Sequence, residues 1–288
     1  MIKKGIILAG GVGSRMSPLT KAVNKQLLPI YDKPLIYYPL SILMLSNIRD
    51  ILIIVNKGQV PQFSKILNRT NNLGIKITFL EQEKPGGLPE AFIIGKNFIG
   101  KSNVALILGY NFFYGQSLTK KLLDSTKLKK GARVFLHPVK NPNLYGVATL
   151  KNNKIVKIIE KPKKTNSNLA VTGLYFFDNN VIKYSESLKP SKRGELEITD
   201  LLNKYLKTKK LKAEFIGRGG TWLDTGSIED FYNATNFVSA VENRQGLKIA
   251  CLEEISLQKK WITKKNLLDS IKFYGKCEYA EYLKKFCK

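Results

Sequence analysis

Cysteine, histidine and arginine are all scarce in this chain of 288 residues. It has three cysteines and one histidine, and only seven of its 48 basic residues are arginine. Cys251, Cys277 and Cys287 have no metal-ligand spacing, and their odd number argues against a disulfide framework. The sequence therefore offers no cysteine-based metal site, and a reducing cytoplasmic location is expected.

The single histidine, His137, lies between Leu136 and Pro138 in a strand-like run. A histidine in that setting is a better candidate for the core than for catalysis. No Cys–His or Ser–His pairing stands out elsewhere, so a nucleophilic hydrolase is a poor fit to this sequence.

Long apolar runs are also missing. No stretch of eighteen apolar residues occurs, so no membrane span is predicted. The N-terminus enters a strand-like run almost at once and lacks the apolar segment of a signal peptide. The chain is long enough to bury a large core as one big domain or two small ones.

Acidic residues are few: 22 stand against 48 basic ones, and the formal net charge is +26. Such an excess raises the possibility of nucleic-acid binding. The excess is nearly all lysine, dispersed as in Lys207–Lys210 and Lys284–Lys285, without interleaved aromatic residues. We therefore expect no specific nucleic-acid partner, and expect the basic surface to steer anionic substrates toward the protein.

Glycines cluster near the N-terminus, directly after an apolar run. The run 5–9 (GIILA) has the length and branching of a buried strand, and GGVGSR follows at 10–15. Three glycines in four positions let backbone N–H groups approach an anion, and Arg15 and Lys25 are cations suited to phosphate. The pattern predicts a polyphosphate site, although a glycine turn with two solvated cations remains the alternative.

Two common phosphate motifs do not match this stretch. A Walker loop requires Gly-Lys-Ser/Thr, whereas Ser14, Arg15 and Met16 follow Gly13. A dinucleotide fingerprint requires a third glycine where Met16 stands, and an acid at the end of a second strand. Asp32 has the right spacing, but its flanking prolines favour a turn.

Strand-like and helix-like segments alternate through the first half of the chain. This alternation predicts an α/β fold: a Rossmann-like, doubly wound and mostly parallel sheet with helices on both faces. Strands are expected at 50–55, 75–80 and 104–108, and helices at 35–46, 60–67 and 90–98. Because ligands bind at the carboxyl ends of such strands, the Gly10 loop, Gln82 and Tyr110 should share one rim.

From residue 132 the pattern changes to strands and turns. Strands are expected at 132–138, 146–150, 154–160, 169–177 and 214–216, with a hairpin turn at Asn152-Asn153. Helices are expected at 196–206 and 227–242, and mainly helix from 264 to 285. We predict a domain at 1–240, with a nucleotide-binding half (1–130) and a sugar-phosphate half (131–240), and a helical extension at 241–288.

Several short sequence motifs along the chain resemble those of nucleotidylyltransferases that act on sugar 1-phosphates. They include the GGxGxR of residues 10–15, KQLLP at 25–29, DKP at 32–34, EKP at 160–162, VTGLY at 171–175, RGELEITD at 193–200, WLDTG at 222–226 and ENRQG at 242–246. The continuation LIYYPL at 35–40 narrows the resemblance to glucose-1-phosphate thymidylyltransferases. The resemblance runs nearly end to end.

The resemblance implies an activity and a set of roles. The family joins dTTP to glucose 1-phosphate, giving dTDP-glucose and pyrophosphate for dTDP-rhamnose-type synthesis, as cytoplasmic homotetramers that require Mg²⁺. Arg15, Lys25 and Lys161 would be catalytic. The nucleotide would meet Leu8, Gly10, Gly11, Gly13, Gln26, Gln82 and Gly87, and the sugar phosphate would meet Tyr145, Gly146, Glu160, Lys161, Val171 and Thr172. From the residues alone, Gln82 would be interpreted as an ordinary polar residue at a strand end, and Glu160 as a member of a surface ion pair.

The expected metal site departs from the family pattern. Asp224 in WLDTG is one implied Mg²⁺ ligand, but the other position, where the family reads Leu-Gly-Asp-Asn, holds Tyr110. A neutral phenol, with a pKa near ~10, is a poor Mg²⁺ ligand at neutral pH. Either catalysis is impaired, or the chain is an inactive paralogue that binds nucleotide or sugar phosphate as a regulatory partner.

Two further regions carry expectations from the family. The base loop reads GLPEA at 87–91 where the family reads Gly-Leu-Ala-Gln-Ala, so it is altered beside the base pocket. A second nucleotide site for feedback would use Tyr114, Gly115, Arg218, Lys248 and Glu254, with Leu45 and Ile255 nearby. The alternative is that these residues only pack a helical tail.

Overall fold

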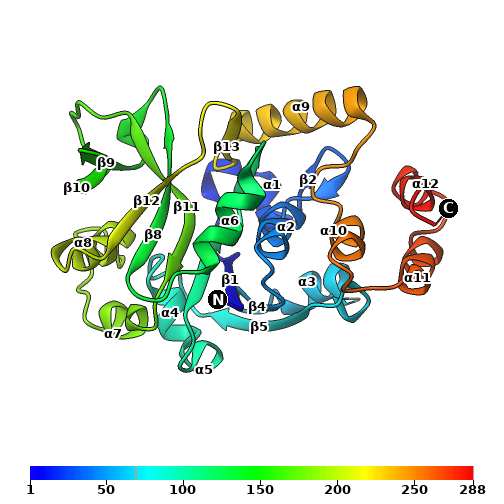
Figure 1. The fold of residues 1–288 in the computed structure, drawn as a ribbon, viewed down its shortest axis with the longest axis horizontal. Helices are drawn as coiled ribbons and strands as arrows, with labels where there is room; N and C mark the ends of the chain where they lie inside the picture. The colour runs from blue at the N-terminus through cyan, green and yellow to red at the C-terminus, as the bar shows by residue number, and fades with distance from the viewer. Residues whose placement is uncertain (69, 288) are drawn as a thin grey trace.

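Four parallel strands form the centre of the molecule in the computed structural model, which describes residues 1–68 and 70–287 (Figure 1). Their order in the sheet is β5-β4-β1-β6. Ile6 lies opposite Leu52 on one side and Leu106 on the other. β1, β4 and β6 have buried apolar centres, as parallel strands covered on both faces require, whereas β5 at the edge of the sheet is only partly buried. The bounds are β1 Lys4–Leu8, β4 Asp50–Asn56, β5 Lys76–Gln82 and β6 Val104–Leu108.

Antiparallel strands extend the sheet beyond β6. β11 (Leu169–Phe177) pairs with β6, then with β9 (Gly146–Lys151) and β8 (Ala132–Pro138), and its register shifts between Val171 and Tyr175. β10 (Lys154–Glu160) and β12 (Leu211–Phe215) complete the nine strands assigned to this sheet in the described part of the chain. Asn152 and Asn153 both have positive φ in the β9–β10 turn, as predicted for a hairpin.

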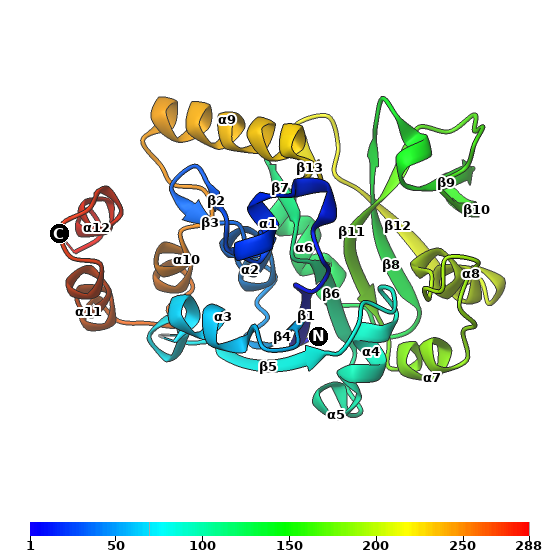
Figure 2. The same ribbon diagram turned by 180° about the vertical axis from the view of Figure 1, so that it is seen from behind.

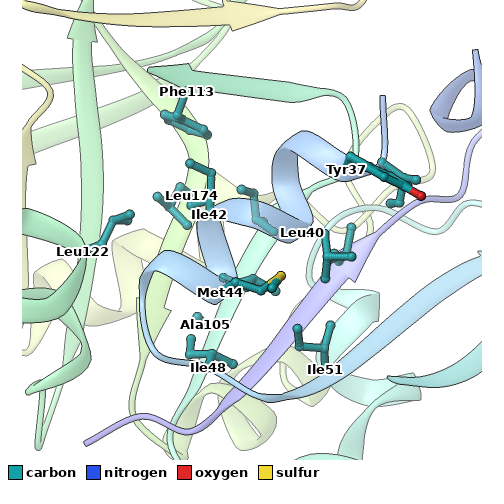
Figure 3. Packing of buried hydrophobic residues seen from close by; sticks show 14 of the residues in the cluster. Tyr37, Leu40, Ile42, Met44, Ile48, Ile51, Ala105, Phe113, Leu122 and Leu174 are labelled. Atoms are coloured by element: carbon teal, nitrogen blue, oxygen red, sulfur yellow. The ribbon is translucent and has the colours of Figure 1, made fainter. Parts of the chain in front are cut away.

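Alternate residues of the central strands face two separate apolar layers. Ile7, Ile51 and Ala105 belong to the same apolar cluster as the buried residues of α2 (Tyr37–Leu45). Figure 3 shows Ile51 and Ala105 in this layer together with Leu40 and Met44. Ile6 and Leu52 face the opposite layer, to which α4, α7 and α8 contribute. The predicted doubly wound α/β arrangement is therefore confirmed. The other helices before residue 228 are α1 Leu19–Ala22, α3 Val60–Leu67, α4 Glu90–Ile94, α5 Lys96–Ile99, α6 Leu118–Thr126, α7 Asn180–Glu186 and α8 Ile198–Lys207.

The last part of the chain is helical. α9 (Ile228–Gln245) runs along one edge, and the predicted domain boundary at 240 falls inside it (Figures 1 and 2). α10 (Leu252–Gln258), α11 (Lys264–Tyr274) and α12 (Glu278–Lys284) follow, and α10 packs on α2. α11 and α12 lie at the end of the molecule opposite β9 and β10 (Figure 2). Within the described residues, none of the helices combines the length and apolar character needed to cross a membrane.

An ion-pair network joins this helical part to an early hairpin, β2 (Pro29–Ile30) and β3 (Lys33–Pro34). The Lys33 ammonium group lies 2.8 Å from the Glu242 carboxylate and also contacts Asp32. Lys248 contacts Asp32 and lies 3.4 Å from Glu242. Asp32 therefore belongs to a turn and an ion pair, as its flanking prolines indicated, and not to a strand end.

Two sequence expectations need correction. The helix predicted at 90–98 is two short helices divided at Gly95, where a Cβ would lie 2.8 Å from the Ala91 carbonyl and 3.0 Å from Leu52. The strand β13 (Gly220–Asp224), which pairs antiparallel with β7 (Asn111–Gly115), was not among the expected strands, and Asp224 is its last residue. Both strands are short and carry glycine, which weakens the strand signal in sequence.

Candidate active site

A cavity of about 560 Å³ opens at the carboxyl ends of the parallel strands. Residues after β1, β5 and β6 line one end of it, as the rim predicted for Gly10, Gln82 and Tyr110 requires. Residues from β9, β10, β11 and the segment before α8 line the other end. The two halves of the chain therefore meet in one cavity.

The glycine loop is fixed by its neighbours on the strand ends. Gly10 packs against the carboxamide of Gln82 so closely that a Cβ would lie 2.7 Å from Gln82 Cδ. The Gly11 N–H donates to Asn56 Oδ1 at 2.8 Å, and Asn56 Nδ2 donates back to the Gly11 carbonyl at 3.0 Å. Gly11 has φ +105°, a conformation that side chains rarely adopt. Asn56, which was not among the predicted site residues, therefore holds the predicted anion loop.

The two cations of the loop reach the same cavity from short helical turns. Arg15 lies in the 3₁₀ turn Ser14–Met16 and is exposed, while Lys25 begins the turn Lys25–Leu27 and is half-buried. Asn24 caps that second turn by accepting from the Gln26 N–H at 2.9 Å. Leu8, Gly13 and Gln26 also line the cavity, so every residue predicted to meet the nucleotide lies along this end.

The base end is closed by the loop after β5. Gln82 is buried at 6% exposure and lines the cavity with Pro85, Gly87 and Leu88. Gly87 has φ +102° and forms a β-bridge to Leu196, far along the chain. A pocket for a planar base between Gln82 and this loop is consistent with the cavity lining.

The opposite end carries the residues predicted to bind the sugar phosphate. Tyr145, Gly146, Glu160, Lys161 and Val171 all line the cavity. Lys161 has φ +39°, a strained conformation for a residue with a side chain, and its N–H donates to the Tyr145 carbonyl at 3.0 Å. Strain of this kind is most often found at functional sites.

Thr172 is the exception among the predicted sugar-site residues. Side chains alternate along β11, so Val171 and Tyr175 contribute to the cavity while Thr172 points to the other face. Thr172 is fully buried, and its hydroxyl donates to the Phe135 carbonyl at 3.0 Å. The expectation that Thr172 lines the sugar pocket is therefore wrong.

A charged cluster from the RGELEITD motif, to which the sequence analysis assigned no role in the site, also lines this end. Arg193 Nη2 lies 2.8 Å from Glu197 Oε2 and 3.8 Å from Glu160 Oε1, and Glu195 lies between them in sequence. Burial and the nearby Glu197 carboxylate raise the pKa of Glu160. Arg193 is thus an exposed cation at this end of the cavity, held by Glu197 and close to Glu160.

Tyr110 lies at the junction of the two ends, beside Asp224. Thr225 Oγ1 donates to the Tyr110 carbonyl at 2.7 Å, and the Thr225 N–H donates to it at 3.0 Å. These bonds place position 110 next to the end of β13, where Asp224 lies. The Tyr110 ring lies under the Lys25 ammonium group, 4.2 Å from the ring centre. The ring thus occupies the position where the resemblance implies a second carboxylate.

Burial and charge together set the protonation of this group of residues. Burial raises the pKa of Tyr110 above its usual value, and the Asp224 carboxylate raises it further, so the phenol is neutral. Burial lowers the pKa of Lys25 to about 8, against the opposing attraction of Asp224. Burial also raises the pKa of Asp224, although Lys25 and Arg15 oppose that shift.

Asp224 offers a carboxylate oxygen to a divalent cation here. Asp224 Oδ1 is buried in the cavity wall and has no hydrogen-bond partner among the described residues. Over the two described ranges, no three His, Cys, Asp or Glu side chains are grouped as a metal site. The residues therefore fit a cation that takes one carboxylate from the protein and its other ligands from phosphate and water.

The residues expected at a regulatory site lie outside this cavity. Gly115 pairs with Gly220, close in sequence to the exposed Arg218. The Tyr114 ring packs against the Phe237 ring, with 5.5 Å between the ring centres. Lys248 is engaged with Asp32 and Glu242, and Glu254 accepts a hydrogen bond from Tyr282 at 2.6 Å. The half-buried His137 lies with its ring edge-on to Trp222 and outside the cavity lining.

A glycine loop with two cations, facing a second polar end that also carries cations, defines a protein that brings two phosphorylated ligands together. Similarity to known proteins specifies the class. The profile of the nucleotidyl transferase family matches residues 4–241, and this chain belongs to that family.

Relatives extend the similarity over the full length. A glucose-1-phosphate thymidylyltransferase of Neisseria meningitidis is 48% identical over 286 residues, 99% of each chain, and one of Mycobacterium tuberculosis is 43% identical over 97% of each. A Bacillus anthracis structure described by the same activity, solved with sucrose, has a TM-score of 0.76 at 40% identity, covering 81% of this chain and 94% of its own. A UDP-glucose pyrophosphorylase solved with UDP-glucose has a TM-score of 0.73 at 28% identity, covering 85% and 100%.

Proposed function

We propose that this chain is a glucose-1-phosphate thymidylyltransferase, which transfers a thymidylyl group from dTTP to glucose 1-phosphate. One observation supports this most directly. The residues expected to meet the nucleotide and nearly all of those expected to meet the sugar phosphate line a single cavity, in a chain similar over its full length to enzymes of that name. The products are dTDP-glucose and pyrophosphate.

The chemistry requires two anions to approach each other. A phosphate oxygen of glucose 1-phosphate forms a bond to the α-phosphorus of dTTP, and the bond from that phosphorus to the bridging oxygen breaks. Pyrophosphate leaves with the bonding electron pair. Because the attacking oxygen is already anionic, no general base is required, and catalysis consists of positioning and charge neutralisation.

Each end of the cavity supplies cations for this task. Arg15 and the N–H groups of the glycine loop would hold the leaving pyrophosphate, and Lys25 would neutralise charge at the α-phosphate. Lys161 and Arg193 would grip the phosphate of the sugar. Gln82 and Gly87 would recognise the base, and Glu160 would accept hydrogen bonds from sugar hydroxyls.

Mg²⁺ is the divalent cation we propose for this site. Asp224, through its unpartnered Oδ1, would hold the ion together with oxygens of the triphosphate. The ion would neutralise part of the triphosphate charge. With Tyr110 in place of a second carboxylate, the protein contributes a weaker metal site than the family pattern implies.

Tyr110 also favours a second candidate function. Its ring fills space between the nucleotide end and the sugar end, beside Lys25 and Asp224. A chain altered in this way could keep both ligand sites and lose turnover, serving as a regulatory partner that binds nucleotide or sugar phosphate. The first function has the stronger support, because Arg15, Lys25, Glu160, Lys161 and Asp224 all line the cavity.

The test measures pyrophosphate released from dTTP with and without glucose 1-phosphate, in Mg²⁺. We expect release that requires both substrates and falls at least about 10-fold in Lys161→Ala. The matched control is Lys163→Ala, an exposed lysine outside the cavity lining, which should leave the rate unchanged. Binding of dTTP without any pyrophosphate release would favour the regulatory partner.

The cellular setting is proposed on the same basis. We expect a cytoplasmic homotetramer that supplies dTDP-glucose to dTDP-rhamnose-type synthesis, with residues 1–130 and 131–240 as nucleotide and sugar halves. Residues 241–288 would form the interface and a regulatory nucleotide site with Tyr114, Gly115, Arg218, Lys248 and Glu254. Arg218 and Lys248 are suitable phosphate ligands, provided that Lys248 exchanges its present carboxylate partners.

A further inference from the structure

Two loops that belong to opposite ends of the cavity are joined by backbone contacts. The base loop, residues 83–89, follows β5, and the sugar-phosphate loop, residues 191–197, precedes α8. The Leu196 N–H donates to the Gly86 carbonyl at 2.8 Å, and Gly87 and Leu196 form a parallel β-bridge. The two loops are about a hundred residues apart in the chain, yet they form one structure over the cavity.

The contact leaves no space for a side chain at the joint. A Cβ on Gly87 would lie 2.1 Å from the Leu196 carbonyl oxygen and 2.7 Å from its nitrogen. Backbone atoms cannot yield in the way that the end of a long side chain can. A movement of Gly87 is therefore transmitted directly to Leu196.

Glu90, which follows the base loop directly in the chain, holds that loop through two hydrogen bonds. Its Oε2 accepts a hydrogen bond from the Gly86 N–H at 2.8 Å, and a Cβ on Gly86 would lie 2.7 Å from the Glu90 carboxylate. The Glu90 N–H in turn donates to the Gly87 carbonyl at 3.2 Å. Glu90 itself begins α4, which packs on α7, so the loop is tied to a rigid part of the fold.

Leu196 is in turn bonded into the loop that carries the charges of the sugar end. Glu195 and Glu197 are its immediate neighbours, and both line the cavity. The Ser191 N–H donates to the Glu195 carbonyl at 2.8 Å, and Ser191 Oγ donates to Glu197 Oε1 at 2.7 Å. Glu197 holds Arg193, as described above. The position of Leu196 thus sets the position of Arg193 and its carboxylate partners.

We infer that the two loops form a latch that couples nucleotide binding to sugar-phosphate binding, with Glu90 as a positioning residue. This inference rests on the proposed function, because it takes the nucleobase to bind against Gln82 and Gly87. A base seated there restricts Gly86 and Gly87, and through Leu196 it orders Arg193, Glu195 and Glu197. Glucose 1-phosphate then binds to a sugar-phosphate loop that is already ordered, so its binding costs less conformational entropy. Binding of each ligand must raise affinity for the other by the same factor.

The test measures the dissociation constant of glucose 1-phosphate by titration calorimetry, with and without saturating dTDP, which lacks the γ-phosphate and so cannot release pyrophosphate. We expect dTDP to tighten glucose 1-phosphate binding at least about 5-fold in the unaltered protein. Glu90→Ala, which removes the acceptor of the Gly86 N–H, should reduce that factor to less than about 2-fold. Glu90→Gln retains an acceptor oxygen and should restore it.

A matched control lies in the same loop. Glu83→Ala removes an exposed carboxylate that pairs with Lys57 on the surface, and it should leave the coupling factor unchanged. Thermal unfolding and dTDP affinity of each variant establish that Glu90→Ala is folded and still binds nucleotide. If Glu90→Ala does not fold, Glu90→Gln and the unaltered protein still test whether coupling exists.

The outcomes separate the latch from the proposed function. Binding of each ligand alone with a coupling factor near 1, or equal coupling in Glu90→Ala and the unaltered protein, would overturn the latch and leave the proposed function standing. Failure of dTDP and glucose 1-phosphate to bind at all would overturn both.

Discussion

The ammonium group of Lys25 lies over the ring of Tyr110, 4.2 Å from its centre. A cation over an aromatic face is attracted by the electrons of the ring, but the ring carries no net charge. A carboxylate at position 110 would attract the same ammonium group and could also bind a metal ion. The Tyr110 ring therefore still attracts the Lys25 ammonium group, but unlike a carboxylate it provides no ligand for a divalent cation.

Lys25 makes nucleotide binding sensitive to alkaline pH. Burial lowers its pKa to about 8, so the charged form is lost as the pH rises through that value. With EDTA present, we expect affinity for dTTP to fall between about pH 7 and about pH 9, because the Lys25 ammonium group loses its charge in that range. Thermal-shift titration measures this fall. Lys25→Arg should remove it, and an equal fall in that variant would contradict the role of Lys25.

The same shift has a consequence for folding. The folded state disfavours the charged form of Lys25, so the resulting penalty is fully present below about pH 8 and diminishes as the pH rises toward the unfolded value of 10.5. Loss of the Lys25 charge is therefore expected to weaken dTTP binding without destabilising the fold at this residue.

Glu242 should be important for stability even though it is remote from the cavity. It is 6% exposed, pairs with Lys33 and Lys248, and accepts from the Ile249 N–H at 2.7 Å. Glu242→Ala leaves Lys33 and Lys248 with Asp32 as their one shared carboxylate. A net positive charge then stays buried, which should lower the free energy of unfolding by about 3–5 kcal/mol. Urea denaturation measures this change. Glu229→Ala, an exposed acid on the same helix, should cost less than about 1 kcal/mol, and equal losses would show that Glu242 is not specially held.

The net charge of +26 predicts weak association with DNA and no sequence selectivity. Dispersed lysines contact phosphates without reading bases, so affinity should fall steeply as salt increases. Fluorescence anisotropy with two unrelated duplexes at several salt concentrations measures this. Tight binding to one of them at physiological salt would favour a nucleic-acid function instead.

The proposed regulatory site predicts that the end product of the pathway binds apart from the active site. dTDP-rhamnose should stabilise the protein thermally, because a ligand of the folded state raises its stability by mass action. Arg218→Ala should abolish that shift and leave the shift caused by dTTP intact. A dTDP-rhamnose shift that survives Arg218→Ala would place the ligand elsewhere, most simply in the active site.

The parallel half of the fold could be predicted from sequence because most of its strands have continuous apolar centres. Buried strands such as β1 and β6 carry their signal in the residues themselves, and their carboxyl ends then predict where Gly10, Gln82 and Tyr110 meet. β7 and β13 could not be predicted in this way, since their pairing depends on a contact between segments about a hundred residues apart.

The parts of the site that escaped prediction depend on three-dimensional contacts. Asn56 holds Gly11 through its amide, and Leu196 meets Gly86 through its backbone, so neither has a signature in sequence. Thr172 was assigned to the sugar pocket because it lies within VTGLY. The alternation of side chains along β11 turns it away from the cavity, and its hydroxyl donates to the Phe135 carbonyl instead.

The replacement of a metal-binding carboxylate by Tyr110 is tested most directly by restoring the acid. Tyr110→Asp supplies a hard oxygen ligand beside Asp224 and removes the ring from the junction of the two ends. Pyrophosphate release from dTTP and glucose 1-phosphate in Mg²⁺ should increase at least about 100-fold over the unaltered protein. Tyr110→Phe, which keeps the ring, should remain at the unaltered rate. Equal rates for Tyr110→Asp and the unaltered protein would contradict the conclusion that Tyr110 limits the metal site.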